Sequence, residues 1–363
     1  MPEFEPVKKK KKTVKKQSGS AFSSLLPNKK DSSGEKIRKI VFLTAILVLI
    51  GATLTVLYFY VFRSDSIEQE MNKLQGMRGE SNGKVISINI KDSENHTGTG
   101  DQPQKTVNIL EEYAELYEAQ PSGNMVGYVE IYPHIQSPVV QAEDNEYYLK
   151  HNFYDVPTEN GTVFADYEVP ITADSTPNNT IIYGHNLITR NMFEPLSLYR
   201  KNGIDFLKEN YRINYDTIYK KNEYLIFSVM LVNTDPERGE VFDYQNNVTF
   251  NSKKEFDSFA AECLDRSYYY TGIDLEYGDE ILTLSTCDFA YFRYDMRLVV
   301  VARKVRDNES NELDPSTFID NTGKDANGNL KRRMFEKFYE MYGGNCKWAG
   351  RQWDTSWIKD YEE

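Results

Sequence analysis

The residues of this chain best suited to covalent chemistry are its three cysteines, Cys263, Cys287 and Cys346. An odd number leaves at least one thiol unpaired within a single chain. Cys287 differs from the other two because it directly follows the apolar stretch 281–286 and precedes Asp288. A rigid strand that ends there could present the thiol at the rim of a β-structure. Cys287 is therefore our candidate nucleophile, with a purely structural cysteine as the alternative.

The other two cysteines suit structural roles better. Cys263 lies in an amphipathic helical pattern at 253–265, and we expect it to be a small buried hydrophobic residue. Cys346 lies among aromatic and basic residues near the C-terminus, where a role in a disulfide stays open. Neither residue ends a predicted strand, so neither is preferred as a nucleophile.

A reactive thiol needs a proton-transfer partner, because the thiolate is the nucleophile and a free cysteine has a pKa of about 8.5. Histidine is the usual partner. His185 follows the predicted strand 180–183 and Gly184, so it could meet Cys287 at one end of the sheet. The other histidines suit a linker, a turn and the end of a short helix: His96, His134 and His151. His185 is our candidate acid and base.

Acyl transfer also needs a donor for the oxyanion that develops on the substrate carbonyl. Arg297 lies near the start of the predicted strand 296–305. If a hairpin joins this strand to the strand of Cys287, the two residues lie side by side. Arg293 falls in the hairpin loop and is the weaker candidate.

Several other chemistries find no support in the sequence. CxxC, HExxH and close histidine pairs are absent, so we expect no zinc site of familiar spacing. GxSxG and P-loop motifs are also absent, and Gly98-Thr-Gly100 lacks the third glycine of a dinucleotide-binding loop. We expect no cofactor and no metal.

The elements that must position these side chains are predicted to be mostly short strands. They are rich in Val, Ile, Tyr or Phe and are bounded by turn residues, at 127–131, 139–141, 162–165, 180–183, 211–215, 224–232, 280–286 and 296–305. Helical patterns are fewer and lie at 107–119, 146–151, 192–199, 253–265 and 331–342. About eight strands with few helices favour a mainly β fold that closes into a barrel, since closure removes exposed edges.

The motif Thr283-Leu-Ser-Thr-Cys287, with Tyr183-Gly-His185 upstream and Arg297 ten residues after the cysteine, resembles the active-site set of the sortases. The resemblance spans about residues 108–305. Two further segments, NEYYL at 145–149 and GTVF at 161–164, together with the helix-bearing connection before Thr283, resemble class B members in particular.

This resemblance implies an eight-stranded sortase-type β-barrel that acts as a cysteine transpeptidase on the outer face of a Gram-positive membrane. Cys287 would attack the carbonyl after the threonine of a C-terminal sorting signal and form a thioacyl enzyme. His185 would exchange the proton, Arg297 would steady the oxyanion, and an amine of the cell-wall precursor or cross-bridge would release the surface protein. The resemblance also implies substrate contacts at Asn145, Leu149, Tyr183, Thr234, Ser285 and Asp288. Ordinary barrel packing is the alternative for Leu149, Tyr183 and Thr234.

The two ends of the chain differ strongly in charge. Residues 1–39 carry a net charge of +8, whereas the 363-residue chain as a whole carries -12, and residues 40–62 have no charged side chain. A helix over 40–62 would be roughly 34 Å long, enough to cross a hydrocarbon core of about 30 Å. Because positive charge stays on the cytoplasmic side, we expect an uncleaved single-pass anchor with its N-terminus inside and the body outside the cell membrane. An acidic body argues against a nucleic-acid partner.

The expected organisation is a basic cytoplasmic tail at 1–39, a transmembrane anchor at 40–62, an extracellular linker at 63–106, the catalytic barrel at 107–305 and a C-terminal extension at 306–363. We expect the aromatic residues of the extension to pack on the barrel. Two alternatives to wall anchoring stay open. One is a pilin polymerase, in which a lysine side chain replaces the wall amine, and the other is a catalytically idle surface binding module on the same barrel.

Overall fold

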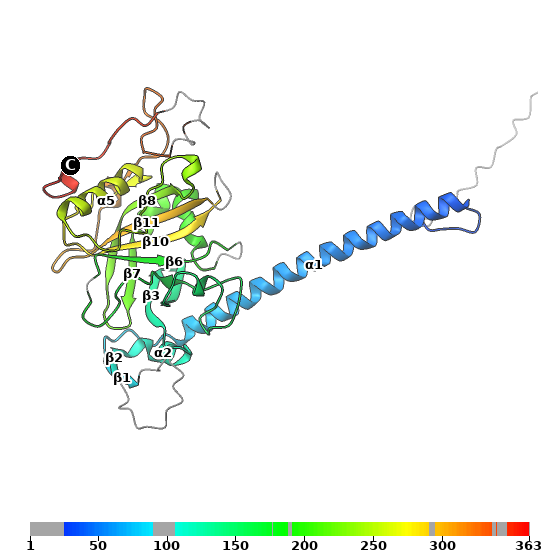
Figure 1. The fold of residues 1–363 in the computed structure, drawn as a ribbon, viewed down its shortest axis with the longest axis horizontal. Coiled ribbons are helices and arrows are strands. Elements are labelled where there is room, and N and C mark those ends of the chain that lie inside the picture. The colour runs from blue at the N-terminus through cyan, green and yellow to red at the C-terminus, as the bar shows by residue number, and fades with distance from the viewer. Residues whose placement is uncertain are drawn as a thin grey trace, which may run out of the picture. The chain divides into compact units, whose positions relative to one another are not determined.

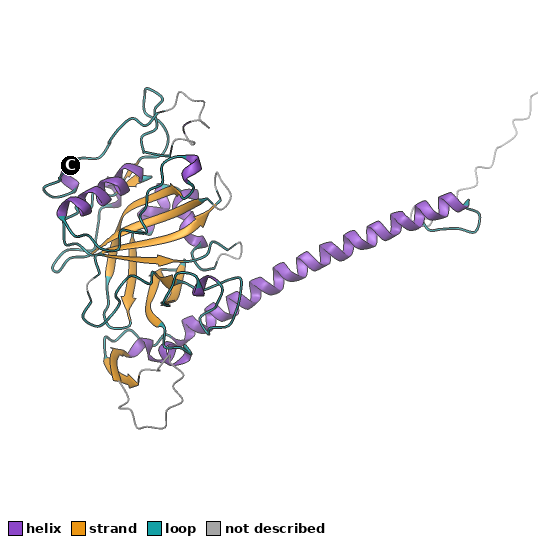
Figure 2. Ribbon diagram, viewed as in Figure 1, coloured by secondary structure: helices purple, strands orange, loops and turns teal. Residues whose placement is uncertain are grey.

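The computed structural model describes residues 25–89, 106–175, 177–187, 191–289, 295–335, 339 and 347–362, with the backbone alone at 59–65. The chain divides into two compact units, Met1–Ser66 and Ile67–Glu363. Figure 1 traces the chain through these elements, and Figure 2 shows that the strands gather in the second unit. That unit holds every residue that the sequence marks for catalysis.

Eight strands of the described residues close into one barrel, which confirms the predicted fold class. Around the barrel their order is β10-β11-β8-β7-β3-β4-β5-β6, and β6 closes on β10 in parallel. All eight predicted strands are present. Their bounds are β3 Met125–Ile131, β4 Ile135–Val140, β5 Phe164–Ala165, β6 Asn179–Tyr183, β7 Arg212–Thr217, β8 Glu223–Asn233, β10 Ile281–Asp288 and β11 Met296–Lys304.

The barrel is rigid around β8, β10 and β11 because these strands are buried on both faces. Ten of the eleven residues of β8 are buried. One face fills the barrel, and helix α5 (Lys253–Arg266) packs on this strand. Strands covered on both sides need nearly continuous apolar sequence, which is what these segments have. The site residues at the ends of β10 and β11 are therefore carried by tightly packed strands.

Helix α5 forms where the sequence predicts a helix over 253–265. The Ser252 side chain accepts from the backbone N–H of Glu255 at 3.2 Å, and this caps the helix N-terminus. Cys263 is fully buried in this helix, as expected for a structural cysteine. The remaining helices of the second unit are short: η2 Glu111–Tyr113, α2 Ala114–Ala119, η3 Tyr147–Leu149, η4 Glu194–Leu196, α3 Ser197–Lys201, α4 Ile204–Glu209, η5 Pro236–Arg238, η6 Pro315–Thr317 and η7 Thr355–Trp357.

The pattern of residues 107–119 predicts one helix, and this prediction is wrong. Its first part is strand β2 (Thr106–Leu110), which pairs with β1 (Val85–Asn89), and only α2 and η2 are helical. The β-branched residues Val107 and Ile109 favour a strand once a partner strand is available. The partner lies about twenty residues upstream, in the span expected to be a linker, so the local pattern could not reveal it.

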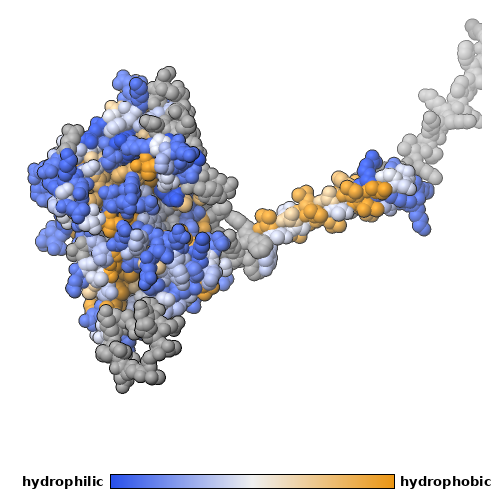
Figure 3. Space-filling view, viewed as in Figure 1, coloured by the Kyte–Doolittle hydropathy of each residue, from blue (hydrophilic) through white to orange (hydrophobic). Residues whose placement is uncertain are grey.

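Helix α1 (Ser33–Met77) contains the apolar segment predicted to be an anchor. Ser33–Tyr58 is long and apolar enough to cross a membrane, and Figure 3 shows hydrophobic residues along this part of the helix. Near its C-terminal end the helix enters the second unit, where Ile67, Met71 and Leu74 are buried. Part of the expected linker is thus folded helix and strand, and residues 90–105 lie outside the described residues.

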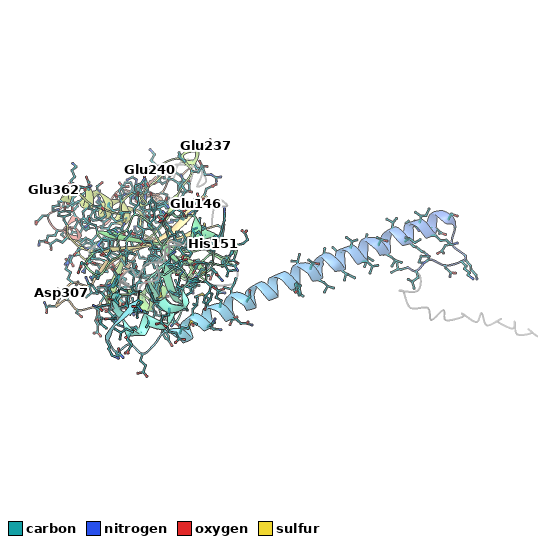
Figure 4. All side chains as sticks on the ribbon, turned by 60° about the horizontal axis from the view of Figure 1, so that its bottom comes forward. Glu146, His151, Glu237, Glu240, Asp307 and Glu362 are labelled. Carbon is teal, nitrogen blue, oxygen red and sulfur yellow. The ribbon has the colours of Figure 1, made fainter. Side chains whose placement is uncertain are left out.

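The C-terminal extension packs on the barrel, as its aromatic residues suggest. Its strand β12 (Ile319–Asp320) pairs with β9 (Tyr269–Tyr270), and the indole N–H of Trp353 donates to Asp265 Oδ1 at 2.7 Å. Near the chain's end, the backbone N–H of Glu362, labelled in Figure 4, donates to Oδ2 of Asp257 in α5. The predicted helix 331–342 does not begin at residue 331, because 331–335 are irregular. Only residue 339 of its remaining positions is among the described residues.

Candidate active site

Cys287 and Arg297 face one another across the β10–β11 hairpin. They are directly opposite residues of this antiparallel pair. Opposite residues of such a pair point to the same face with their Cβ atoms about 5 Å apart. The thiol and the guanidinium therefore lie on one side of the sheet. Cys287 is partly exposed, and Arg297 Nη1 donates to the carbonyl oxygen of Met296 at 3.1 Å.

The chain after β6 brings His185 to the same end of the barrel. Ser285 of β10 is paired with Tyr183 of β6, and the backbone N–H of Gly184 donates to Ser285 O at 3.2 Å. Thr286 Oγ1 donates to Gly184 O at 2.7 Å. These bonds continue the β6–β10 contact beyond the end of β6. As a result, His185 follows β6 at the end of the barrel where Cys287 lies, one residue before β10 ends.

The His185 ring is oriented by a backbone carbonyl. Its Nε2 lies 2.9 Å from the oxygen of Leu149. Because a carbonyl oxygen only accepts, Nε2 carries the hydrogen of this bond and Nδ1 is the nitrogen that can exchange a proton. Gly161 lies against the ring with φ +58°, and a Cβ there would be 2.9 Å from His185 Cδ2 and 2.6 Å from Tyr148 O. Glycine at this position lets the loop pass close to the imidazole.

The three catalytic candidates line one cavity of about 290 Å³. Four of the six predicted substrate-contact residues line it as well, namely Asn145, Leu149, Tyr183 and Ser285. The structure thus brings together side chains from the segments 145–149 and 183–185 and from β10 and β11. Phe164, Gly184, Gln245 and Thr286 complete the described lining.

The remaining two predicted contacts lie elsewhere. Thr234 Oγ1 donates to the carbonyl oxygen of Asp295 at 3.1 Å, and the backbone N–H of Thr234 donates to the same oxygen at 2.9 Å. Asp288 is buried and accepts from Arg200 Nε at 3.1 Å. Among the described residues that line the cavity, neither is present.

Comparison with known proteins agrees with this geometry. The family model described as Sortase domain matches residues 134–305. Residues 134–305 form a sortase domain. Sortase B of Listeria monocytogenes is 32% identical over 166 residues, which cover 46% of this chain and 63% of that protein, so the match spans less than two thirds of this relative. Sortase B of Staphylococcus aureus is 25% identical over 230 residues, covering 61% of this chain and 90% of that protein.

The sortase domain is also similar to solved structures of class B sortases. The crystal structure of sortase B from Bacillus anthracis in complex with AAEK1 matches with a TM-score of 0.51 and 26% identity, over 68% of this chain and 99% of that chain. A second structure from Bacillus anthracis, described as similar to sortase B, matches with a TM-score of 0.50 and 27% identity, over 66% of this chain and 96% of that chain. The class B resemblance predicted from the sequence is therefore confirmed.

A buried carboxylate organises one wall of the sortase cavity. Asp166 Oδ2 accepts from the Tyr183 hydroxyl at 2.8 Å and from Asn145 Nδ2 at 2.9 Å. Burial, followed by the negative charge of Asp166, raises the pKa of Tyr183 well above its ordinary value. The phenol therefore stays protonated and keeps donating. This network holds the Asn145 and Tyr183 side chains in place from behind.

Two residues of the β8–β10 connection that lie at the sortase site were not predicted from the sequence. Gln245 lines the cavity, and the buried Tyr244 hydroxyl lies 2.6 Å from Ser285 Oγ. Burial raises the pKa of Tyr244 to about 12, while Ser285 and the positive charge of Arg297 oppose the rise. Both belong to the long β8–β10 connection, whose sequence carries no motif that marks them. Only the folding of this connection over β10 reveals them.

The other candidates of the sequence are not at this site. The His134 ring packs on Phe206 with centroids 5.0 Å apart, and His151 stacks on Tyr147 at 4.0 Å. The described residues contain no group of three or more His, Cys, Asp or Glu side chains that could hold a metal ion. Three further candidates lie outside the described residues, namely His96, Arg293 and Cys346.

Proposed function

We propose that the chain is a membrane-anchored cysteine transpeptidase of the class B sortase type, which joins surface proteins with a C-terminal sorting signal to an amine of the cell wall. One observation carries the proposal: Cys287 stands opposite Arg297, and His185 lines the same cavity. A nucleophile, a fixed cation and an imidazole at one open cavity are the parts that acyl transfer needs.

In the first half-reaction, the Cys287 proton passes to His185 and the sulfur attacks the carbonyl carbon after the threonine of the sorting signal. The carbonyl electron pair moves to oxygen, and the Arg297 guanidinium donates to this oxyanion. When the carbonyl re-forms, the C–N bond breaks and the imidazolium gives its proton to the leaving amine. The acyl group is then held on Cys287 as a thioester.

In the second half-reaction, an amine attacks the thioester carbon. His185, now neutral, takes the proton that the amine loses, and the bond to Cys287 Sγ breaks as the carbonyl re-forms. The imidazolium then returns a proton to the Cys287 thiolate. The new amide replaces the old one, so the energy of the cleaved bond is kept and no cofactor is required. The Nε2 contact with Leu149 O leaves Nδ1 of His185 as the nitrogen that exchanges protons in both halves.

We assign the binding of the sorting signal to the cavity residues Asn145, Leu149, Tyr183 and Ser285. Asp166 fixes two of them, which favours a preorganised groove over packing alone. For Thr234 and Asp288 we propose positioning roles. Thr234 bonds to the backbone of Asp295, beside β11, and Asp288 anchors the end of β10 to Arg200.

The membrane arrangement belongs to the same proposal. The apolar segment Ser33–Tyr58 would form a single-pass anchor in the cell membrane of a Gram-positive organism. The excess of Lys and Arg before it would keep the N-terminus cytoplasmic and the sortase domain outside. There the enzyme could meet both exported proteins and the amines of peptidoglycan precursors.

The deciding experiment uses the full chain in uncharged detergent with short peptides of the LPXTG and NPXTN types and a soluble amine. We expect cleavage with transfer to the amine. Cys287→Ala should abolish both, and His185→Ala should lower both by several orders of magnitude. Cys263→Ala and His134→Ala are matched controls that should retain activity, because neither residue lines the cavity. Cleavage that persists in Cys287→Ala would refute the assignment.

A further inference from the structure

A second cavity lies where the C-terminal extension covers the barrel. It has a volume of about 580 Å³ and shares no lining residue with the candidate active site. Its walls come from the end of α3, from β9 and from the segment 320–332 of the extension. This size falls within the range of sites that bind small organic ligands.

The cavity is lined by four cationic side chains and one carboxylate. The cations are Arg200, Lys201, Lys324 and Arg332, and the carboxylate belongs to Asp320. One oxygen of Asp320 already accepts from the backbone N–H and the hydroxyl of Thr322, at 2.7 and 2.6 Å. The lining thus has a strong excess of positive charge.

Arg200 and Lys201 have carboxylate partners. Arg200 Nε donates to Asp288 Oδ2 at 3.1 Å, and Lys201 Nζ lies 3.0 Å from Glu194 Oε1. Arg332 is the most buried of the four cations, with 4% of its surface exposed. None of the ion pairs among the described residues involves Arg332, and its Nε has no hydrogen-bond partner.

A buried arginine without a carboxylate is costly unless something else compensates its charge. The ring of Tyr268 supplies part of this, because the Arg332 guanidinium stands 4.0 Å above it. The backbone on both sides is fixed as well: Lys331 N–H donates to Gly323 O and Arg333 N–H donates to Asp265 O. The guanidinium is therefore held in place at the cavity wall with donors left over.

We propose that this cavity binds a phosphate group, either of a soluble phosphate ester or of a phospholipid headgroup. A guanidinium held in a fixed plane can donate to two oxygens of a phosphate, and a phosphate monoester carries more negative charge than a single carboxylate. Lys324 and Arg200, which also line the cavity, would add positive charge. The positive charges of Arg332 and Arg200 oppose the burial that raises the pKa of Tyr268, whereas the negative charge of Asp288 adds to the rise.

The test is calorimetric titration of the full chain in uncharged detergent micelles with glycerol phosphate and inorganic phosphate. A second arm adds phosphatidylglycerol to the same micelles and distinguishes a lipid source from a soluble one. We expect binding in one arm at least, weakened roughly tenfold or more by Arg332→Gln, since a charged hydrogen bond is lost. Arg332→Lys should bind with intermediate affinity.

Two further variants keep the outcome clear if Arg332→Gln folds poorly. Lys324→Gln changes an exposed residue of the same wall and should weaken binding severalfold. Lys359→Gln removes one exposed charge from the same extension away from the cavity, and its affinity should match that of the unchanged chain. The proposal is overturned if neither arm shows binding, or if Lys324→Gln and Arg332→Lys bind as tightly as Lys359→Gln.

Discussion

Cys287 and Arg297 occupy directly opposite positions of β10 and β11. The pairing fixes the separation of the two Cβ atoms through the backbone ladder and not through a flexible loop. In the proposed mechanism, Arg297 donates to the oxyanion that forms when Cys287 attacks the acyl carbon. An electrostatic donor that waits in position costs no reorganisation at the moment of reaction, which is the main source of its catalytic effect.

Replacing Arg297 should test this relationship directly. Arg297→Gln should lower kcat/KM for peptide cleavage about 100-fold to 1,000-fold, the usual effect of losing one oxyanion donor. Arg297→Lys keeps the positive charge but loses the planar guanidinium, so its activity should lie between that of Arg297→Gln and that of the unchanged enzyme. Arg212→Gln, on β7 and outside the cavity, is the control. Equal activity of Arg297→Gln and the unchanged enzyme would show that the oxyanion is bound elsewhere.

Thiol labelling should separate the two described cysteines. Burial raises the pKa of Cys263 well above its ordinary value, so its thiol stays protonated through neutral and mildly alkaline pH. Cys287 is partly exposed in the cavity. Peptide mapping after brief alkylation between pH 7 and pH 9 should show modification of Cys287 roughly 100-fold faster than of Cys263. Comparable rates in the folded protein would contradict the burial of Cys263.

Gly161→Ala should disturb His185 without touching it chemically. The added methyl would meet Tyr148 O at 2.6 Å and His185 Cδ2 at 2.9 Å. Gly203→Ala is a matched control, since Gly203 has a similar positive φ and no atom within 4 Å of the new Cβ. The positive φ should lower stability by about 1–2 kcal/mol in both variants, and Gly161→Ala should lose more because its methyl also meets the backbone oxygen of Tyr148.

Only Gly161→Ala should also reduce peptide cleavage, by roughly 100-fold, because a small displacement of a catalytic group is expensive. Chemical denaturation measures the first effect, and steady-state kinetics of the two variants measure the second. If both variants cleave at the same rate, the contact between Gly161 and the imidazole has no catalytic importance.

The C-terminal extension should contribute to the stability of the sortase domain. Trp353 is buried and donates to Asp265, a residue of α5. Trp353→Ala should lower the free energy of unfolding by about 3–5 kcal/mol, the usual cost of emptying a large aromatic site. Trp357 is only partly buried, and Trp357→Ala should cost less. Equal effects in urea denaturation would indicate that the tail does not pack as described.

Ion pairs reinforce the same attachment. Glu240, labelled in Figure 4, accepts from Arg266 of α5 at 2.8 Å and from Arg333 of the extension at 2.7 Å. Arg333 also reaches Glu262 at 2.9 Å. The extension is thus tied to α5 by charge as well as by apolar packing, and it forms one wall of the second cavity.

The sequence alone determined the parts of this protein that depend on neighbouring residues. Segments rich in Val, Ile, Tyr or Phe mark all eight strands of the barrel, and helix α5 has its own N-terminal cap. The pair Cys287 and Arg297 also follows from local sequence, because a short hairpin that joins two strands sets their register. The charge-free segment before the body is equally evident from composition.

The tertiary structure alone decided which distant segments of the chain meet at the site. The parallel contact of β6 with β10 joins residues about a hundred positions apart, and it brings His185 to Cys287. Asp288 pairs with Arg200, Thr234 bonds outside the cavity, and Gln245 lines it. None of these contacts follows from the local sequence pattern, because such a pattern reports only which secondary structure neighbouring residues favour. Contacts between distant residues are decided by the packing and burial of the whole barrel.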